Sequence, residues 1–300
     1  MTELLALDLK ARAMHAISLD GSRVRTLVEG LDATPDGIVV DQGRGHIYWT
    51  SMGAPDTRPE PGGEPPFFRR NGKIERVDFA GEQRTTIVPA GGFTTGKQLT
   101  ADFAAGRLYW CDREGMQVLT CDLDGGDLHA LVVTGEGPED AEVVRNWPVG
   151  ICLDLDRRLL YWTQKGASKA GDGRIFRAPL KLPTGASPRH RGDIELLWQD
   201  LPEPIDLELL DDGTLVWTDR GKAPEGNTLN RATVQPAPGP PQILSSGYRE
   251  AIGVAAVSES RFYVSDLGGS IRLVDLSDGT DEVIARPGGP LTGLALADLG

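Results

Sequence analysis

The stretch GRLYWCDREG, residues 106–115, sets an aromatic pair between a Gly-Arg turn and a charged loop, and nearly the same phrase returns four times. The copies read GHIYWTSMG from Gly45, RLLYWTQKG from Arg158, GTLVWTDRG from Gly213 and SRFYVSDLG from Ser260. They start roughly 45 to 60 residues apart, the period at which propeller blades repeat. A sixth copy lacks the aromatics, but residues 5–21 align with residues 109–125 and 263–279 without a gap. The sequence therefore predicts six structural units.

Each unit contains four short runs bounded by turn residues, as in PVGICLDL, RLLYWTQ, GRIFRAPL and DIELLWQDL between residues 148 and 201. Four strands per unit are typical of one propeller blade. The last stretch, PLTGLALADLG from Pro290, resembles a first strand, whereas the N-terminus begins directly with a second strand. We therefore expect an all-β, six-bladed β-propeller with four-stranded antiparallel blades. Residues 1–300 form one domain in this prediction, and residues 290–300 complete the blade begun at residues 4–31.

The repeated tetrads, residues 48–51, 109–112, 161–164, 216–219 and 263–266, resemble the YWTD repeats of low-density-lipoprotein-receptor type propellers. The resemblance covers essentially the whole chain, in a stand-alone, bacterial-like version. It implies that the tetrad tyrosines and tryptophans pack between sheets, and that the fourth tetrad residue, an acid, ties strands together by hydrogen bonds. Ser51 and Gln164 depart from that acid. The fold does not transfer the receptors' biology, since one fold hosts many functions.

The composition excludes several classes of partner. A net charge of −13 disfavours nucleic acid and anionic lipid, which require a concentrated positive face. No run approaches the eighteen apolar residues of a membrane span, and MTELLALDLKAR at the N-terminus does not have the pattern of a secretory signal. We therefore expect a cytoplasmic location. The three cysteines fall in predicted strands without a Cys-x-x-Cys spacing, which favours small buried hydrophobic side chains.

Three loops are enlarged on one face of the predicted ring. The loops before each first strand and between the second and third strands share this face, which we call the mouth of the central channel. The second-to-third loop is short at residues 267–270, but it expands at residues 52–73, 165–174 and 220–228. A loop as long as residues 52–73 is a lid, a binding element or a tolerated insertion. Phe67 and Phe68, beside two arginines, are the candidate ligand-binding residues within it.

A glycine recurs near the axis at the start of the first strands, at Gly37, Gly150, Gly253 and Gly293, but Gln98 and Asp206 occupy this glycine slot in the other two blades. A side chain at this slot is expected to project toward the channel. The surrounding polar residues are typical of a small-molecule site, although solvated charges at a propeller mouth are the alternative. The candidate ligand-binding residues here are Asp36, Lys97, Gln98, Asn146, Trp147, Arg249 and Glu250.

No histidine lies at these strand starts, so a carboxylate is the expected proton carrier. Glu203 and Asp206 stand three residues apart at one strand start and are the candidate catalytic pair, with pKa values raised by burial and mutual repulsion. The first hypothesis is accordingly a small-molecule binding protein or a carboxylate acid/base enzyme, such as a hydrolase, lyase or cyclase. Whether the chain is an enzyme stays open from the sequence.

Two alternatives remain. The YWTD resemblance implies a non-catalytic platform for a protein partner. The phrase PDGIVVD from Pro35 is in addition similar to the SMP-30 and gluconolactonase propellers, which implies a metal-dependent, lactonase-like hydrolase with calcium or magnesium at the channel mouth. The hard oxygen ligands offered for such an ion are Asp36, Asn146, Glu203 and Asp206. The sequence does not decide whether a metal is bound.

Overall fold

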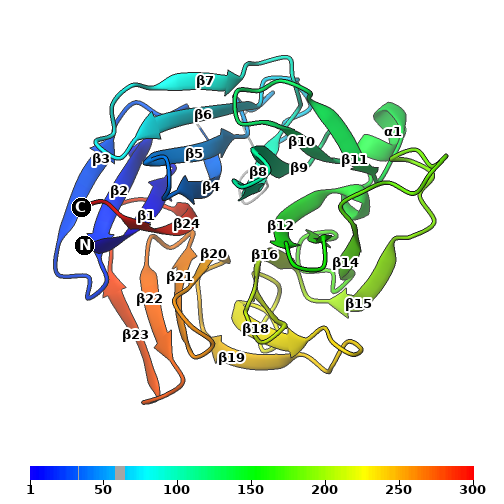
Figure 1. Ribbon diagram of the computed structural model, residues 1–300. Coiled ribbons are helices and arrows are strands. Elements are labelled where there is room, and N and C mark those ends of the chain that lie inside the picture. The colour runs from blue at the N-terminus through cyan, green and yellow to red at the C-terminus, as the bar shows by residue number, and fades with distance from the viewer. Residues whose placement is uncertain (33, 58–64) are drawn as a thin grey trace.

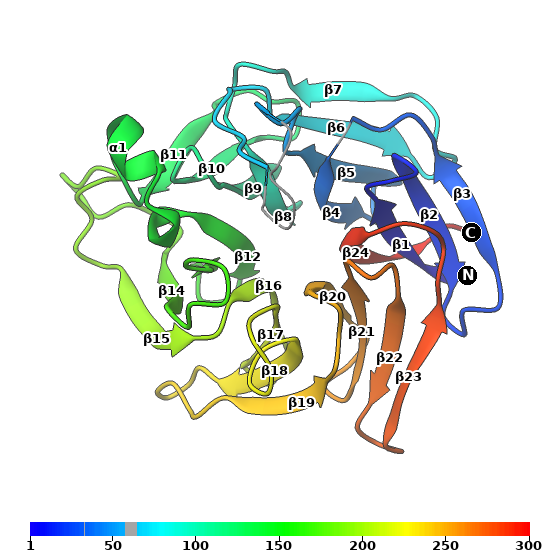
Figure 2. The same ribbon diagram turned by 180° about the vertical axis from the view of Figure 1, so that it is seen from behind.

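The chain folds as a ring of blades around a central axis (Figure 1). The structure, a computed structural model, describes residues 1–32, 34–57 and 65–300. Within these residues, six four-stranded antiparallel sheets surround the axis, so the predicted all-β, six-bladed propeller is confirmed. The short helix α1 (Gly137–Ala141) lies at the outer edge beside the third blade in both views (Figures 1 and 2), followed by the 3-10 turn η1 (Val144–Asn146). No helix in the described part of the chain combines the length and apolarity needed to cross a membrane.

The blades are numbered here in chain order, and their strands run from the axis outward. Blade 1 contains β24 (Leu291–Asp298), β1 (Thr2–Asp8), β2 (Ala13–Ser18) and β3 (Val24–Val28). Blade 2 contains β4 (Pro35–Asp41), β5 (His46–Ser51), β6 (Lys73–Asp78) and β7 (Thr85–Val88). Blade 3 contains β8 (Gly96–Asp102), β9 (Arg107–Asp112), β10 (Gln117–Asp122) and β11 (His129–Val133).

The second half of the ring has the same arrangement. Blade 4 contains β12 (Pro148–Asp154), β13 (Leu159–Gln164), β14 (Gly173–Pro179) and β15 (Glu195–Leu201). Blade 5 contains β16 (Pro204–Leu209), β17 (Thr214–Asp219), β18 (Thr228–Thr233) and β19 (Gln242–Ser246). Blade 6 contains β20 (Ala251–Ala256), β21 (Arg261–Asp266), β22 (Ile271–Asp275) and β23 (Thr280–Ala285).

The two ends of the chain share blade 1. Strand β24 is its innermost strand and pairs antiparallel with β1, with Leu4 opposite Leu296 and Leu5 opposite Ala295. In Figure 1 the red C-terminal strand lies beside the blue N-terminal one. Because β24 supplies the inner strand that the N-terminal segment lacks, the ring has no open end at this blade. The predicted closure by the C-terminal strand is confirmed.

Adjacent aromatics of one tetrad pack against different blades. Side chains alternate along a strand, so Tyr48 and Trp49 point to opposite faces of blade 2. Trp49 lies in a core cluster with Leu5 and Leu7 of blade 1, whereas Tyr48 lies in a cluster with Trp110 of blade 3. The tetrad tryptophans are at most 1% exposed: Trp49, Trp110, Trp162 and Trp217. The repeat therefore forms the apolar contacts between neighbouring sheets.

In five of the six blades the third tetrad residue joins its blade to the next through a hydrogen-bonding side chain. The Thr163 hydroxyl accepts the Gly150 N–H at 2.7 Å within blade 4 and donates to the Ile205 carbonyl of blade 5 at 2.8 Å. Threonine or serine makes the same pair of bonds in blades 2, 5 and 6, and the Cys111 thiol reaches the Gly150 carbonyl from blade 3 at 3.4 Å. Blade 1 has Leu7 at this position, and Thr292 of β24 bonds the Pro35 carbonyl instead.

The fourth tetrad residue anchors the loop that precedes the first strand. The Asp112 carboxylate accepts the Thr94 and Thr95 N–H groups, and the Asp219 carboxylate accepts the Glu203 N–H. Gln164 also reaches this loop, but with opposite polarity, since its amide donates to the Asn146 carbonyl at 3.1 Å. In blade 2, Ser51 instead accepts the N–H of Gly53 at 3.0 Å. The fourth tetrad residue therefore fixes the preceding loops of blades 3, 4 and 5.

Replacing Thr163 by Val is expected to destabilise the fold, because the buried Gly150 N–H and Ile205 carbonyl both lose their partner. The free energy of unfolding should fall by about 2 to 4 kcal/mol. Urea denaturation measures the change, with Thr163→Ser as the matched control, since Ser265 makes both bonds in blade 6. Equal stabilities of the Val and Ser variants would show that the hydroxyl does not join the blades.

Candidate functional site

The glycine slot is sterically closed to side chains where glycine occupies it. A Cβ on Gly150 would lie 2.0 Å from the Ile205 carbonyl oxygen, and one on Gly37 would lie 2.5 Å from the Leu99 nitrogen. The strand registers place Gln98 and Asp206 at the position equivalent to Gly37. Both side chains instead line a cavity on the propeller axis, as expected from the sequence.

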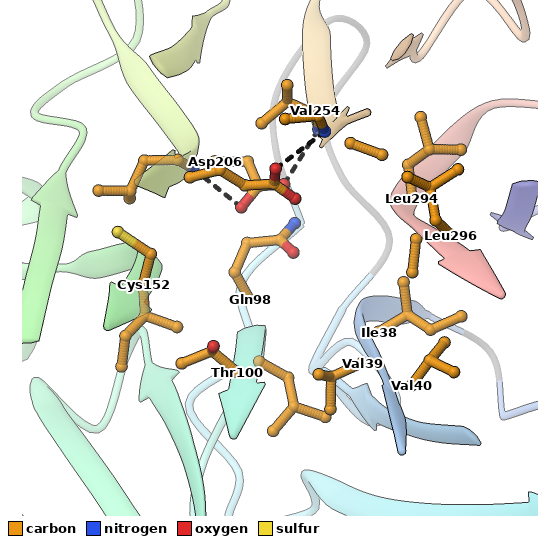
Figure 3. A pocket seen from close by; sticks show the side chains of 17 residues that line it. Ile38, Val39, Val40, Gln98, Thr100, Cys152, Asp206, Val254, Leu294 and Leu296 are labelled. Carbon is orange, nitrogen blue, oxygen red and sulfur yellow. Dashed lines mark hydrogen bonds between the residues drawn. The ribbon is translucent and has the colours of Figure 1, made fainter. Parts of the chain in front are cut away.

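This channel cavity has a volume of about 290 Å³ and is formed by the inner strands of the six blades (Figure 3). Apolar residues of all six inner strands line it, together with several polar residues. Figure 3 shows the Gln98 amide beside the Asp206 carboxyl group at one part of this wall. The side chains that bring polar atoms or a thiol to it are Gln98, Thr100, Cys152, Asp206 and Glu208.

Asp206 is buried, at 7% exposed, and is held by backbone groups of two blades. Its Oδ1 accepts the Leu207 N–H at 3.0 Å and its Oδ2 accepts the Val254 N–H at 3.1 Å. Burial raises the pKa of the Asp206 carboxyl well above its usual range, although these two hydrogen bonds oppose the shift. The nearby carboxylates of Glu208 and Asp36 raise it further. The site thus contains a carboxyl group poised to hold a proton.

The acid that accompanies Asp206 in the cavity is Glu208 rather than Glu203. Residues two apart on a strand share a face, so Asp206 and Glu208 of β16 both line the cavity. Burial raises the pKa of Glu208 to about 7, and its Oε2 accepts the Ala256 N–H at 2.8 Å. Glu203 precedes the strand and lies in a separate group of charges. The expected pairing of Glu203 with Asp206 is therefore replaced by a pairing that strand periodicity would have indicated.

Replacing Glu208 by Gln should change how stability depends on pH. The folded-state pKa of Glu208 is raised from 4.5 to about 7, so its contribution is fully present below pH 4.5 and is lost as the pH rises through 7. Gln keeps the acceptor for Ala256 without this loss. Between about pH 5 and 8, the free energy of unfolding of the wild type should fall by about 1 to 3 kcal/mol more than that of the variant. Parallel curves from urea denaturation across this range would contradict the shift.

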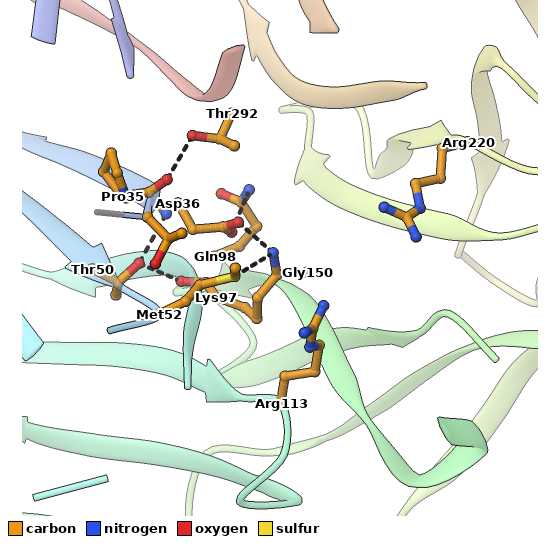
Figure 4. Close-up of polar contacts among 12 residues, drawn as sticks. Pro35, Asp36, Thr50, Met52, Lys97, Gln98, Arg113, Gly150, Arg220 and Thr292 are labelled. Atoms are coloured by element: carbon orange, nitrogen blue, oxygen red, sulfur yellow. Dashed lines mark hydrogen bonds and ion pairs between the residues drawn. The ribbon is translucent and has the colours of Figure 1, made fainter. Parts of the chain in front are cut away.

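Charged residues cover the axis at the mouth (Figure 4). The Lys97 ammonium bonds the Asp36 carboxylate and contacts the Met52 sulfur at 3.4 Å, while the Gln98 amide lies 3.4 Å from Asp36 Oδ1. Burial lowers the pKa of Lys97; Asp36 opposes this shift, and the nearby Arg113 adds to it. The structure thus brings together Asp36, Lys97 and Gln98, three of the residues expected at the site.

A second group of charges at the mouth surrounds Glu203, which is fully buried. Its carboxylate accepts Lys165 Nζ at 3.1 Å, Arg220 Nε at 2.7 Å and the Lys169 N–H at 3.1 Å. Burial raises the pKa of Glu203 and Lys165 opposes the rise. Glu250 stands at the rim, 3.8 Å from both Arg220 and Lys169. Glu203 therefore orients cations at the mouth.

Arg113 is the aromatic-flanked cation of the mouth. Its guanidinium lies 5.0 Å from the centre of the Trp147 ring and 5.7 Å from that of Phe67, and it forms an ion pair with buried Glu114. Phe67 is 1% exposed, whereas Phe68 is 44% exposed and meets Trp147 edge to face. The described ends of loop 52–73 thus contribute packing to the mouth, while residues 58–64 of this loop lie outside the described residues.

The remaining expected residues lie at the rim. The Asn146 amide donates to the Asp140 carbonyl at 3.1 Å and its own carbonyl accepts Thr134 and Gln164, which gives it a local structural role. Arg249 is exposed, and its backbone N–H bonds Asp266. Neither is brought into contact with Asp206 by the described hydrogen bonds.

Sequence reasoning missed the cations that follow the tetrads. Arg113, Lys165 and Arg220 each come directly after a tetrad, in three consecutive blades. The second strand ends at the mouth, so this position in every repeat faces the axis region. Comparing the residue after each tetrad across the blades would have revealed the three cations.

The residues proposed as metal ligands do not fit a divalent ion. Lys97 binds Asp36, Glu203 is bonded by two cations, and Asp206 is bonded by two backbone N–H groups. Within residues 1–32, 34–57 and 65–300, no group of three or more His, Cys, Asp or Glu side chains could hold a metal ion. Ammonium and guanidinium groups thus already compensate Asp36 and Glu203, and backbone N–H groups bond both oxygens of Asp206.

The fold and the mouth define a six-bladed propeller with a charged axial site, and comparison with known proteins places it in a family. The chain is 42% identical over 291 residues to the low-density lipoprotein receptor-related protein 1 of Pyricularia oryzae, covering 92% of this chain and 89% of that protein. The chain belongs to this family of low-density-lipoprotein-receptor-related YWTD propellers. No protein-family model matches the chain.

A second relative is a 3-hydroxyacyl-CoA dehydrogenase-like protein of Cochliobolus heterostrophus, 36% identical over 306 residues. The match covers 97% of this chain but 62% of that protein, so the chain spans less than two thirds of this relative. Among solved structures, a chain of a nidogen/laminin complex has a TM-score of 0.74 at 19% identity, covering 100% of this chain and 99% of that one. A gluconolactonase from Xanthomonas campestris has a TM-score of 0.61 at 15% identity, covering 87% and 78%. These two likenesses show the fold alone.

Proposed function

We propose that the chain binds a small molecule on the propeller axis, where the charged mouth meets the channel cavity. The observation that carries this proposal is Asp206, a buried acid that occupies a slot closed to side chains in four sister blades. A buried carboxyl group is costly unless it is stabilised or used, and perturbed carboxyls cluster at functional sites. The cavity that Gln98, Asp206 and apolar residues of the inner strands line offers room for the uncharged part of a ligand.

The same arrangement favours acid/base chemistry if the bound molecule reacts. Burial raises the pKa of Asp206 and raises that of Glu208 to about 7, so Glu208 can exchange a proton near neutral pH beside a second carboxyl group. This supports a hydrolase, lyase or cyclase without a metal ligand set. Glu203 is assigned the role of positioning the mouth cations, because its carboxylate is bonded by Lys165 and Arg220.

The experiment compares the capture of a small molecule by the wild type and by a variant that lacks the Asp206 carboxyl group. Native mass spectrometry of the full chain, mixed with a water-soluble metabolite extract, should reveal a bound small molecule whose occupancy falls about tenfold or more in Asp206→Asn. Asn cannot accept both backbone N–H groups, so stability should also fall by about 1 to 3 kcal/mol. Asp211→Asn, at an exposed turn, is the control. A captured molecule retained equally by all three proteins would remove Asp206 from the site.

A protein-binding function on the same face is the second candidate. It is favoured by the exposed Phe68 beside Trp147 at the rim, and a chain with a similar fold was solved in a nidogen/laminin complex. Aromatic side chains are enriched at protein–protein interfaces. Replacing Phe68 by Ser should weaken the binding of a protein partner and leave the capture of a small molecule at Asp206 unchanged.

A further inference from the structure

Four cations from three consecutive blades converge on the mouth. Arg113, Lys165 and Arg220 follow the second strands of blades 3, 4 and 5, and Lys97 comes from the inner strand β8 of blade 3. Figure 4 shows the Lys97 ammonium and the guanidinium groups of Arg113 and Arg220 turned toward the same region near the axis. The repeat thus places four positive charges close together. The chain does not need them for solubility, because its net charge is −13.

This gathering is buried. The side chains of Lys97, Arg113, Lys165 and Arg220 are 10%, 6%, 3% and 11% exposed. Every one of them has acidic partners, yet burial still lowers the pKa of Lys97 and Lys165, and Arg113 lowers both further. Burial thus outweighs the acidic partners in its effect on the pKa of both lysines. A further negative charge beside these two ammonium groups would favour their charged forms.

The cations are held in place before any ligand arrives. Arg113 lies between the rings of Trp147 and Phe67, and Glu203 orients Lys165 and Arg220 from below the rim. Guanidinium and ammonium groups fixed by packing and by ion pairs lose little entropy on binding an anion. Planar guanidinium groups also match the geometry of carboxylate and phosphate oxygens.

We propose that Lys97, Arg113, Lys165 and Arg220 bind the oxyanion group, a carboxylate or a phosphate, of a small molecule. This inference rests on the proposed function for the place of the ligand, and it adds the chemical class. The oxyanion binds to the four cations at the mouth, and the uncharged part of the molecule extends toward Gln98 and Asp206.

The experiment measures binding of acetate and of inorganic phosphate to the full chain by calorimetry, with chloride at equal ionic strength and acetamide as references. At least one oxyanion should bind the wild type, while chloride and acetamide should not. Arg220→Gln should weaken binding about tenfold or more, the effect of losing a hydrogen bond to a charged group. Lys181→Gln removes an exposed lysine at the opposite end of blade 4 and should leave binding unchanged.

Arg220→Lys keeps the positive charge and replaces Arg220→Gln in the experiment if the latter does not fold. It should bind the oxyanion more weakly than the wild type because the planar guanidinium group is lost.

Binding of acetate alone or phosphate alone identifies the oxyanion group. Equal binding of chloride, an equal loss in Lys181→Gln, or no binding by the wild type overturns the inference. Oxyanion binding that survives in Asp206→Asn supports the anion site and counts only against Asp206 as part of the proposed site. A neutral molecule captured at Asp206 without oxyanion binding leaves the function standing and rejects the anion site.

Discussion

Removing residues 290–300 is expected to abolish the cooperative fold. The deletion takes away β24, whose Leu291, Leu294 and Ala297 are at most 4% exposed, and it leaves β1 without its inner neighbour. Each buried leucine lost costs about 2 to 5 kcal/mol, so the sum approaches the whole stability of a typical domain, about 5 to 15 kcal/mol. The bond from Thr292 to the Pro35 carbonyl, which joins blade 1 to blade 2, disappears as well.

Circular dichroism and urea denaturation check this result. The truncated chain should lose its cooperative transition or aggregate through the exposed strand edges. Deleting Gly300 alone is the matched control, because this exposed residue lies beyond β24. A soluble truncated chain that unfolds at the wild-type midpoint would show that the ring does not depend on closure by the C-terminal strand.

Replacing Gly150 by Ala is expected to be among the most damaging single substitutions. The added Cβ would lie 2.0 Å from the Ile205 carbonyl oxygen, which belongs to the backbone of the next blade. Since the obstacle is backbone rather than a flexible side chain, two inner strands must separate. The cost should reach about 3 kcal/mol or more. The bond between Thr163 and Ile205 would be strained by the same movement.

Gly192→Ala provides the comparison, because a Cβ at Gly192 meets nothing within 4 Å. In thermal or urea denaturation, the free energies of unfolding of the two variants should differ by the full steric cost at Gly150. If Gly150→Ala is as stable as Gly192→Ala, the slot can open, and the presence of Asp206 in the equivalent position of blade 5 would need no functional explanation.

Some features of the site followed from the repeat, and others did not. Gln98 and Asp206 were predicted to face the channel from one alignment column, because the sister blades carry glycine there. The pairing of Asp206 with Glu208 was not predicted, because it depends on the alternation of side chains along β16 and not on closeness within the loop before that strand. The roles expected for Glu203 and Asn146 were also incomplete, since their partners come from other segments of the chain.

The sequence by itself determined the six units, the four strands in each and the closure by the last strand. These features depend on local periodicity and on a motif that is repeated along the chain, and the resemblance of that motif to YWTD repeats implied the packing of the tetrad aromatics. Only the tertiary structure decided which charges meet at the mouth: Lys97 with Asp36, and Lys165 with Arg220 around Glu203. The physical reason is that these contacts join different blades. Residues that are 38 and 61 positions apart become neighbours when the ring closes, and their burial and pKa values depend on that closeness.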